Sequence, residues 1–401
     1  FGPVDGLLII AGSLCSAPLV ILLLYMRRPK LEHLIIAEPR ADGRQVHSLS
    51  NSKILQTPVP THIRQFIVRS RHPLRVPLAK HLWMLFLGGV IISSIAFAPL
   101  LLDSSNIGFI LLALFVAIPA WLVGFSTPVF AWWSYSSSRF HLTTTRQQGE
   151  AMLIAGMLST FPAIVINSFI TPGAVLLLTG GQASATLVEN ITVIVSAPVG
   201  EELCKALAVF SLAGLIDSKK RGFQVGFTVG LGFALLENLQ YILFSLFAGE
   251  VMAFSYGLTT VVRGIGSIPG HAMWTACSGY AIGHILEQRK QPHRIPDVKQ
   301  WNLVNPLNPS ASRFEPSLTS HPSFFSKSSN LQLPTSLPVM LGIAMFGHAF
   351  WNGSSVLMSY MSGNLGPVVG LIAELTWIVV LIALLWTFGR FVLAAAMEDD
   401  V

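Results

Sequence analysis

Residues 83–103, WMLFLGGVIISSIAFAPLLLD, and 107–133, IGFILLALFVAIPAWLVGFSTPVFAWW, decide the class of fold. Each run is long enough for one α-helix to cross the hydrocarbon core of a bilayer, which takes about 20 apolar residues. Their one charged residue is Asp103, at the end of the first run. Because backbone groups in lipid must satisfy their own hydrogen bonds, we expect two transmembrane helices joined by a tight turn.

The composition of the whole chain agrees with a membrane protein. Hydrophobic residues make up 52% and charged residues 11% of the 401, and the mean hydropathy is +0.63. A soluble domain carries about 25% charged residues. The net charge of +6 does not indicate nucleic-acid binding, because the basic residues are not gathered on any nucleic-acid module. The three cysteines lie in apolar runs, which disfavours a disulfide framework.

Seven further apolar runs continue this pattern along the chain. The nine predicted spans are 6–26, 83–103, 107–133, 151–179, 185–216, 223–248, 253–286, 338–361 and 365–389. Prolines and glycines inside several spans predict tilts, kinks and breaks. The predicted fold is therefore an all-α, polytopic transmembrane helix bundle of about nine spans. The chain begins at Phe1 rather than Met, so we expect a fragment or a processed form.

The placement of Lys and Arg predicts the orientation of these spans. With the N-terminus outside, the inner segments hold 23 of the 25 basic residues: 27–82, 134–150, 217–222, 287–337 and the tail after 389. Basic residues concentrate in cytosolic loops, so we expect the large loops in the cytosol. The basic segment 27–82 would lie along anionic lipid headgroups. Residues 288–337, rich in Ser, Pro, Asn and Lys, are predicted to be disordered.

Polar motifs interrupt four consecutive spans, the fifth to the eighth. They are 196–205 (SAPVGEELCK), 233–241 (FALLENLQY), 269–274 (PGHAMW, with Arg263 upstream) and 347–352 (GHAFWN). A charge in the bilayer core costs several kcal/mol, so each of these residues requires a reason. Four motifs in succession favour one shared functional site over four separate structural contacts.

The spacing of the ionisable residues places several of them one helical turn apart, on the same face of a predicted helix. Lys205 follows Glu201 by four residues and Glu202 by three, so it can neutralise one of these glutamates. The two glutamates diverge by about 100° around the helix, so one can face a reacting centre while the other contacts a neighbouring helix. The one-turn spacing recurs in two pairs, Glu237 with Tyr241 and His348 with Asn352.

These residue types suit hydrolysis. A buried carboxylate can act as a general base on water. His271 and His348 can bind a metal together with a carboxylate, for which we choose Glu202, or orient water and stabilise an oxyanion. Asn352 would be a neutral donor to that oxyanion. No serine or cysteine on these faces has a histidine beside it, so a nucleophilic triad is the weaker interpretation.

Three ionisable residues lie apart from the motifs. We expect Glu189 and Glu374 to reach the membrane interface or to pair with Arg263, rather than to act directly. His284 lies about 20 Å along the helix from His271 and is expected to be interfacial.

In their order along the chain, the four motifs resemble those of the PrsW family of intramembrane proteases. The residues that carry the resemblance are Glu201-Glu202-x-x-Lys205, Glu237-Asn238-x-x-Tyr241, Pro269-Gly270-His271-Ala272-x-Trp274 and His348-Ala349-x-Trp351-Asn352. The resemblance covers about residues 150–395, which would form the catalytic membrane domain. Residues 1–82 would hold the first transmembrane helix and a basic cytosolic segment, and 83–149 the second and third helices.

The resemblance implies a helical membrane peptidase that cleaves membrane-associated proteins, in a wider clan with the CAAX prenyl endopeptidases. By position, the implied site residues are the paired Glu201 and Glu202, one of them a general base, with Glu237, His271, His348 and Asn352. The implied supporting residues are Lys205, Asn238, Tyr241 and Arg263. CAAX peptidases have Arg four residues after the second glutamate, where this chain has Ala206, which favours the PrsW branch and disfavours prenylated substrates.

The cofactor and two other functions stay open at this point. Members of the clan are often called metalloproteases, but a metal-free glutamate mechanism has also been argued, and the residues fit either Zn²⁺ or no metal. The expected partners are membrane lipid and a membrane-anchored protein substrate. A proton-coupled secondary transporter would use similar intramembrane residues, but it usually shows an internal repeat, which this sequence lacks. The intact set of Glu, His and Asn disfavours a catalytically inactive membrane scaffold.

Overall fold

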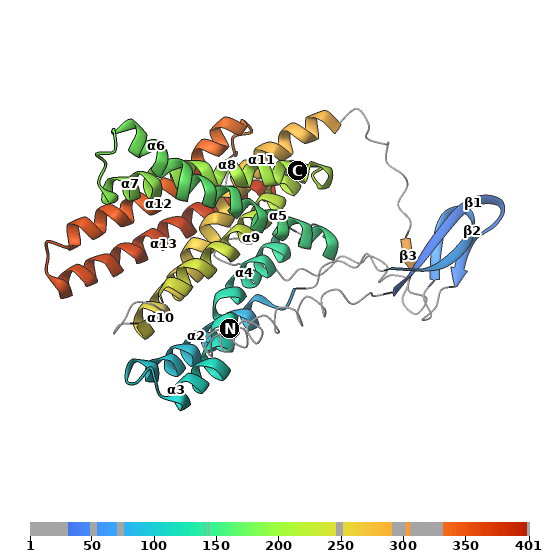
Figure 1. The fold of residues 1–401 in the computed structure, drawn as a ribbon. Helices are drawn as coiled ribbons and strands as arrows, with labels where there is room; N and C mark the ends of the chain where they lie inside the picture. The colour runs from blue at the N-terminus through green and yellow to red at the C-terminus, as the bar shows by residue number, and fades with distance from the viewer. Residues whose placement is uncertain are drawn as a thin grey trace, which may run out of the picture. The chain divides into compact units, whose positions relative to one another are not determined.

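The computed structural model describes residues 31–48, 54–69, 76–140, 142, 144–245, 252–290, 302–304 and 332–398. These residues divide into a large helical unit and a small β unit, each compact in itself (Figure 1). The first predicted span, 6–26, lies outside the described residues, as does most of the loop predicted to be disordered.

The small unit is a three-stranded antiparallel sheet in the order β1-β2-β3. Its strands are β1 Leu31–Ser48, β2 Ile54–Arg69 and β3 Asn302–Val304. The all-α prediction is wrong for this part of the chain. The physical reason lies in the composition of β2, whose Ile, Val, Thr and Phe side chains favour strands. Pro58 and Pro60 within it would also disrupt a helix interior.

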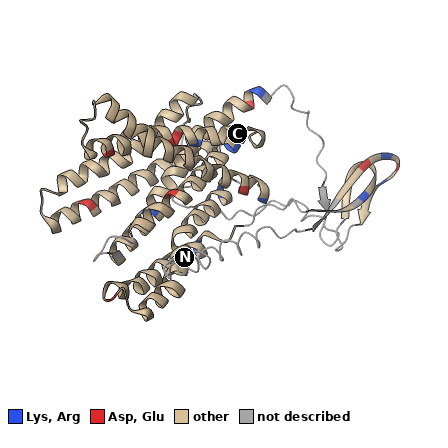
Figure 2. Cartoon of the chain, viewed as in Figure 1, with Lys and Arg blue, Asp and Glu red and all other residues tan. Residues whose placement is uncertain are grey.

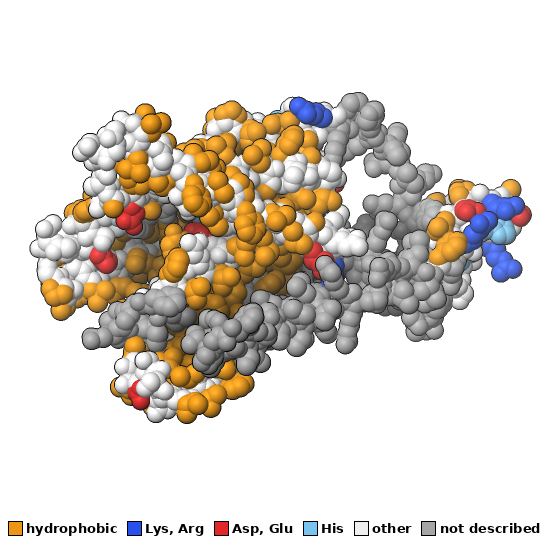
Figure 3. Space-filling model, viewed as in Figure 1, with side chains coloured by type: hydrophobic (Ala, Val, Ile, Leu, Met, Phe, Trp, Pro, Cys, Tyr) orange, Lys and Arg blue, Asp and Glu red, His pale blue; other side chains and the backbone are white. Residues whose placement is uncertain are grey.

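The large unit is built from helices. Its α-helices are α2 Ala79–Phe97, α3 Ile107–Leu112, α4 Ile118–Phe140, α5 Arg146–Val165, α6 Thr171–Leu178, α7 Ala185–Ile191, α8 Ala197–Ser211, α9 Lys219–Ser245, α10 Met252–Val262, α11 Ile268–Lys290, α12 Leu337–Ser362 and α13 Pro367–Glu398. Charged side chains are sparse over these helices (Figure 2). Large apolar side chains face outward, such as Leu177 and Leu178 at 82% and 85% exposed, as contact with lipid requires (Figure 3).

Five helical stretches among the described residues are long and apolar enough to cross a membrane. They are Ala79–Leu101, Ile107–Phe140, Arg146–Leu178, Lys219–Ser245 and Pro367–Met397. The protein is therefore an integral, multi-pass membrane protein. The predicted spans 185–216, 253–286 and 338–361 also form helices, but polar motifs interrupt their apolar sequence. The count of nine spans and the outside location of the N-terminus stay predictions.

Among the described residues, four helical stretches contain a π-helical segment that ends two residues before a proline. The segments are η2 Ala113–Ala117, η3 Ile166–Ile170, η4 Thr192–Ser196 and η7 Arg263–Ser267, followed by Pro119, Pro172, Pro198 and Pro269. Proline lacks an N–H, and its ring collides with the carbonyl of the residue four positions earlier. The helix therefore widens at these points instead of ending. Such π segments often mark functional sites.

Side chains of neighbouring helices bond to carbonyl oxygens of the π segments. Trp132 Nε1 donates to Gly264 O at 3.0 Å, Trp386 Nε1 to Ile265 O at 2.8 Å and Asn352 Nδ2 to Val193 O at 3.0 Å. Lipid offers no partner to an irregular backbone. These bonds therefore hold η7 against α4 and α13, and η4 against α12.

The central helix α9 packs on α11 and α5 through glycines, and it is the most buried of the five candidate spans. A Cβ atom on Gly230 would lie 2.3 Å from the carbonyl oxygen of His271 on α11. On the other side, a Cβ atom on Gly232 would lie 2.2 Å from the carbonyl oxygen of Leu153 on α5. Small residues thus let the backbones approach closely and bring Glu237 of α9 against His271.

Candidate active site

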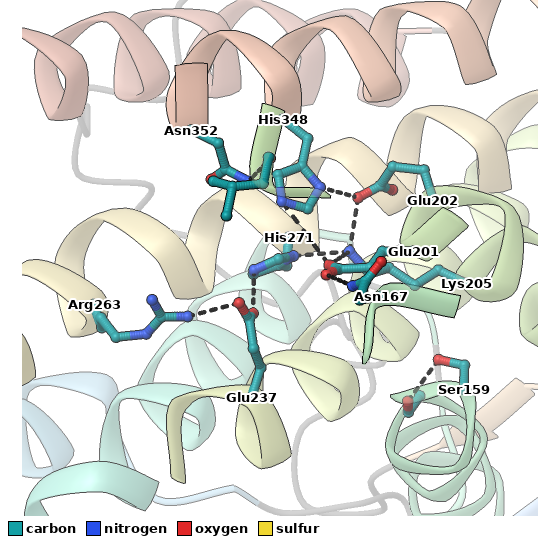
Figure 4. Close-up of polar contacts among 12 residues, drawn as sticks. Ser159, Asn167, Glu201, Glu202, Lys205, Glu237, Arg263, His271, His348 and Asn352 are labelled. Carbon is teal, nitrogen blue, oxygen red and sulfur yellow. Dashed lines mark hydrogen bonds and ion pairs between the residues drawn. The ribbon is translucent and has the colours of Figure 1, made fainter. Parts of the chain in front are cut away.

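The four polar motifs meet inside the helical unit (Figure 4). The residues that form the cluster are Glu201, Glu202 and Lys205 from α8, Glu237 from α9, His271 from α11 and His348 from α12. The side chains of Glu202 and Lys205 are 0% exposed, and that of Glu237 is 14% exposed. Four helices that are distant in sequence therefore present their ionisable groups to one another.

Lys205 lies at the centre of this cluster. Its Nζ lies 2.7 Å from Glu202 Oε1, 2.8 Å from His271 Nδ1 and 3.6 Å from Glu201 Oε2. It also lies 4.0 Å from the centroid of the Phe233 ring. The prediction that Lys205 neutralises one of the two glutamates is thus confirmed, and the nearer partner is Glu202. A buried ammonium without a partner is strongly unfavourable, and the two glutamates compensate its charge.

His271 has a partner at each ring nitrogen. Because the ammonium of Lys205 can only donate, His271 Nδ1 accepts, which places the ring proton of a neutral imidazole on Nε2. His271 Nε2 lies 2.5 Å from Glu237 Oε2, and Arg263 Nη2 lies 2.9 Å from Glu237 Oε1. A carboxylate that bonds a histidine in this way fixes its tautomer and its ring orientation. Arg263 in turn compensates the charge of Glu237.

His348 lies between an aromatic ring and the two glutamates. Its imidazole stacks on Trp274, with ring centroids 4.7 Å apart and 12° between the planes. His348 Nδ1 lies 3.1 Å from Glu202 Oε1, and His348 Nε2 lies 3.9 Å from Glu201 Oε2. Gly347 leaves room for Trp274, because a Cβ atom there would lie 2.7 Å from Trp274 Nε1.

Glu201, His271 and His348 form a group that fits a metal ion. Each offers one ligand atom, and these atoms lie within 4.8 Å of one another. Glu201 Oε2 is buried and has no hydrogen-bond partner among the described residues. Two imidazoles and one carboxylate are also the protein ligands of catalytic zinc in several peptidases. Since both nitrogens of His271 already have partners, a metal there would replace either Lys205 or Glu237 at that ring.

Asn167, in η3, is a site residue that sequence reasoning missed. Its Nδ2 donates to Glu201 Oε1 at 3.2 Å. This bond holds one oxygen of Glu201 and leaves Oε2 beside the imidazoles. The available signal was an amide inside an apolar span, five residues before Pro172, since such a group also needs a partner in lipid.

Asn352 does not bond to the glutamates or histidines of the cluster among the described contacts. Its amide donates to the carbonyl of Val193 instead, at 3.0 Å. Asn352 therefore joins α12 to η4, immediately before the helix that carries Glu201. This placement differs from the expected donor to an oxyanion, whose role stays a prediction.

The remaining predicted residues surround Arg263. Its Nε bonds to Asn238 Oδ1, and its guanidinium lies 3.9 Å from the centroid of the Tyr241 ring. These contacts hold Arg263 where it meets Glu237. Among the described residues, its ion pair is with Glu237 rather than with the expected Glu189 or Glu374.

The ionisable residues outside the motifs, Glu189, His284 and Glu374, lie outside the cluster. Glu374 Oε1 accepts a hydrogen bond from Ser362 Oγ. His284 Nε2 lies 2.9 Å from Gln288 Nε2, at an exposed position. Glu189 lines a cavity beside the cluster.

The site thus gathers buried glutamates and histidines from four helices, and three of these residues could hold a metal ion. Residues 148–306 match the family described as "PrsW family intramembrane metalloprotease", so the chain carries a domain of this family. The matched range includes the first three motifs. The fourth, with His348, lies beyond it, and the tertiary structure brings it to the others. No curated protein and no solved structure matches the chain.

Proposed function

We propose that this protein is an endopeptidase that hydrolyses peptide bonds of membrane-associated proteins, and that Glu201 takes part in activating the attacking water, as a general base without metal or as a ligand of a bound metal. The observation that carries the proposal is the buried Glu201 Oε2, which has no hydrogen-bond partner among the described residues and lies beside two imidazoles. Such an oxygen keeps its lone pairs for a proton of water or for a metal ion. The PrsW domain match supports the same reaction class.

Glu201, His271 and His348 would hold the metal, with zinc the ion best suited to these donors. When bound, zinc would supply Lewis-acid chemistry, polarising the scissile carbonyl and making water a better nucleophile. We expected Glu202 as the carboxylate ligand. The geometry favours Glu201, because its ligand atom lies within 4.8 Å of those of both histidines, whereas Glu202 Oε1 contacts Lys205 Nζ and His348 Nδ1.

The other residues then have separate tasks. Glu202 accepts the Nδ1 proton of His348 and leaves its Nε2 free toward Glu201. Glu237 orients His271 in the same way. Lys205 places a positive charge at the centre of the cluster, where it would stabilise the negative charge that develops during peptide hydrolysis.

The test combines metal content with proteolysis. Wild type and the variants Glu201→Ala, His271→Ala and His348→Ala are purified in detergent for elemental analysis. Each is also reconstituted with a mixture of single-span membrane peptides, and the products are analysed by mass spectrometry. The matched control is His284→Ala, which removes the same side chain from α11 outside the cluster.

We expect zinc and cleavage in wild type and in the His284 variant, and the loss of both in all three cluster variants. Cleavage by a zinc-free wild type would instead indicate a glutamate mechanism without metal. Wild-type rates in any two of the three cluster variants would overturn the proposal. Proton-coupled flux that survives the loss of both histidines would favour a carrier.

A further inference from the structure

A cavity of about 520 Å³ lies beside the candidate active site. Its walls come from η3, α6, α7 and η4, and include Asn167, Leu176, Val188, Glu189, Thr192 and Val193. Figure 3 shows a hollow in the surface beside α7, with acidic side chains at its edge. The volume falls within the roughly 300–1,000 Å³ of typical ligand-binding pockets.

One wall residue of the cavity contacts the cluster directly, and a second contacts Asn352 on α12. Asn167 lines the cavity and also donates to Glu201 Oε1. Val193 lines it as well, and its carbonyl accepts from Asn352. A chain segment that occupied the cavity would therefore lie one side chain away from Glu201.

The chemistry of the walls indicates what this segment carries. Leu176 and Val188 make the cavity largely apolar, and Glu189 is its one charged wall residue. Among the described residues, no side chain forms an ion pair with Glu189. The side chain of Glu189 is exposed at the cavity, so its carboxylate is available to a cation that a bound segment carries. A Lys or Arg side chain fits this environment, because its aliphatic stem packs on apolar residues while its charged end reaches the acid.

We propose that this cavity binds the substrate, and that Glu189 selects membrane-anchored proteins with a Lys or Arg side chain near the scissile bond. The inference rests on the proposed endopeptidase function. Glu189 is a specificity-determining residue in this account, and it takes no part in the chemistry at Glu201.

The test uses the full chain in liposomes and a set of single-span peptides with identical apolar sequence. The peptides differ at one scanned position, which holds Lys, Gln or Glu, and each carries a fluorophore and a photoreactive group. Crosslinking measures binding, and mass spectrometry measures cleavage. We expect wild type to prefer the best Lys peptide over its Gln counterpart by about ten-fold, equivalent to ~1.4 kcal/mol. Glu189→Gln should remove this preference, and Glu189→Lys should transfer it to the Glu peptide.

The matched control is Glu374→Gln, which neutralises an acid of α13 that bonds to Ser362 and lies outside the cavity lining. It should keep the wild-type preference. Leu176→Trp should fill the cavity and weaken crosslinking of every peptide, while the zinc content stays that of wild type.

The outcomes separate this inference from the proposed function. Cleavage with the same peptide preference in wild type, Glu189→Gln and Glu189→Lys would overturn the cavity assignment and leave the endopeptidase intact. A crosslinking preference that follows the charge at residue 189, in a protein that cleaves no peptide, would support the cavity and overturn the endopeptidase.

Discussion

Lys205 Nζ lies 2.8 Å from His271 Nδ1, and this contact joins the glutamate motif on α8 to the histidine motif on α11. The ammonium sets the tautomer of His271 and adds a positive charge beside two carboxylates. Lys205 Nζ also lies near Glu201 and Glu202, so a metal ion bound by these carboxylates and His271 would compete with it for the same position. We therefore expect Lys205 and a metal ion to compete for this position.

Replacing Lys205 by an apolar residue should separate its effect on stability from its competition with a metal ion. Lys205→Met leaves buried carboxylates without their counter-charge, so we expect a loss of about 3–5 kcal/mol in the free energy of unfolding. The same change should tighten zinc binding, because the competing cation is gone. Thermal unfolding with and without added zinc measures both effects. Lys80→Met removes an exposed lysine of α2 and should alter neither; equal zinc affinity in the Lys205 variant and wild type would contradict the competition.

Arg263, Glu237 and His271 form consecutive contacts, and we expect their effects on metal binding to be coupled. Removing Glu237 frees the His271 ring, and groups that orient a ligand histidine typically contribute about 10–100-fold to metal affinity or activity. We expect Arg263→Gln and Glu237→Gln each to lower zinc affinity, and the double variant to lose much less than their sum. Isothermal titration of zinc into the metal-free protein measures this coupling.

The control for that cycle is the Arg146–Glu150 pair, with Nε and Oε1 2.8 Å apart and both side chains partly exposed. Pairs of this kind on a helix surface contribute about 0.3–0.5 kcal/mol, so its loss should leave zinc affinity unchanged. Full additivity in the Arg263 and Glu237 cycle would show that the two residues act independently.

Gly347 should be required for the orientation of His348. In Gly347→Ala, the new Cβ atom would displace Trp274 from its stacked position, so zinc affinity and proteolysis should both fall. Tryptophan fluorescence should report the displacement. Gly342→Ala, on the same helix, meets no atom within 4 Å and should be neutral or slightly stabilising, because alanine favours helix more than glycine. Equal behaviour of the two variants would contradict the packing argument.

Asn167 should position Glu201 rather than act on the substrate. Asn167→Ala removes one hydrogen bond to a carboxylate, for which about 1.5–3 kcal/mol is typical, so cleavage should slow by roughly ten-fold or more. Asn167→Asp places a second carboxylate at that oxygen and should be more harmful. Asn190→Ala removes a comparable amide, which bonds to Tyr360 Oη at an exposed position, and should have little effect. Steady-state cleavage rates in liposomes distinguish the three.

Much of this protein follows from neighbouring residues alone. The apolar runs predicted the membrane helices, because the bilayer sets the required length. The spacing of Lys205 from Glu201 and Glu202 predicted an ion pair with one of them, because all three residues lie on one helix. The prolines at 172, 198 and 269 likewise marked where the helices depart from α geometry.

Contacts between residues far apart in the chain could not be predicted from the sequence in the same way. The hairpin of β1 and β2 within residues 27–82 was not predicted from the sequence, because pairs such as Leu31 with Arg69 join residues far apart in the chain. Asn167 was missed for the same reason, since its partner Glu201 lies on another helix.

The tertiary structure decided which groups of the site meet. The sequence placed two glutamates and two histidines in successive helices, but their contacts depend on how each helix is rotated and how closely it packs. Gly230 brings α9 against the carbonyl of His271, and Gly347 makes room for Trp274 beside His348. The spacing of residues within one helix is a local property, so it can be predicted from the sequence. The rotation of one helix against another comes from packing across the bundle, and that packing turns Glu201 Oε2 toward the imidazoles.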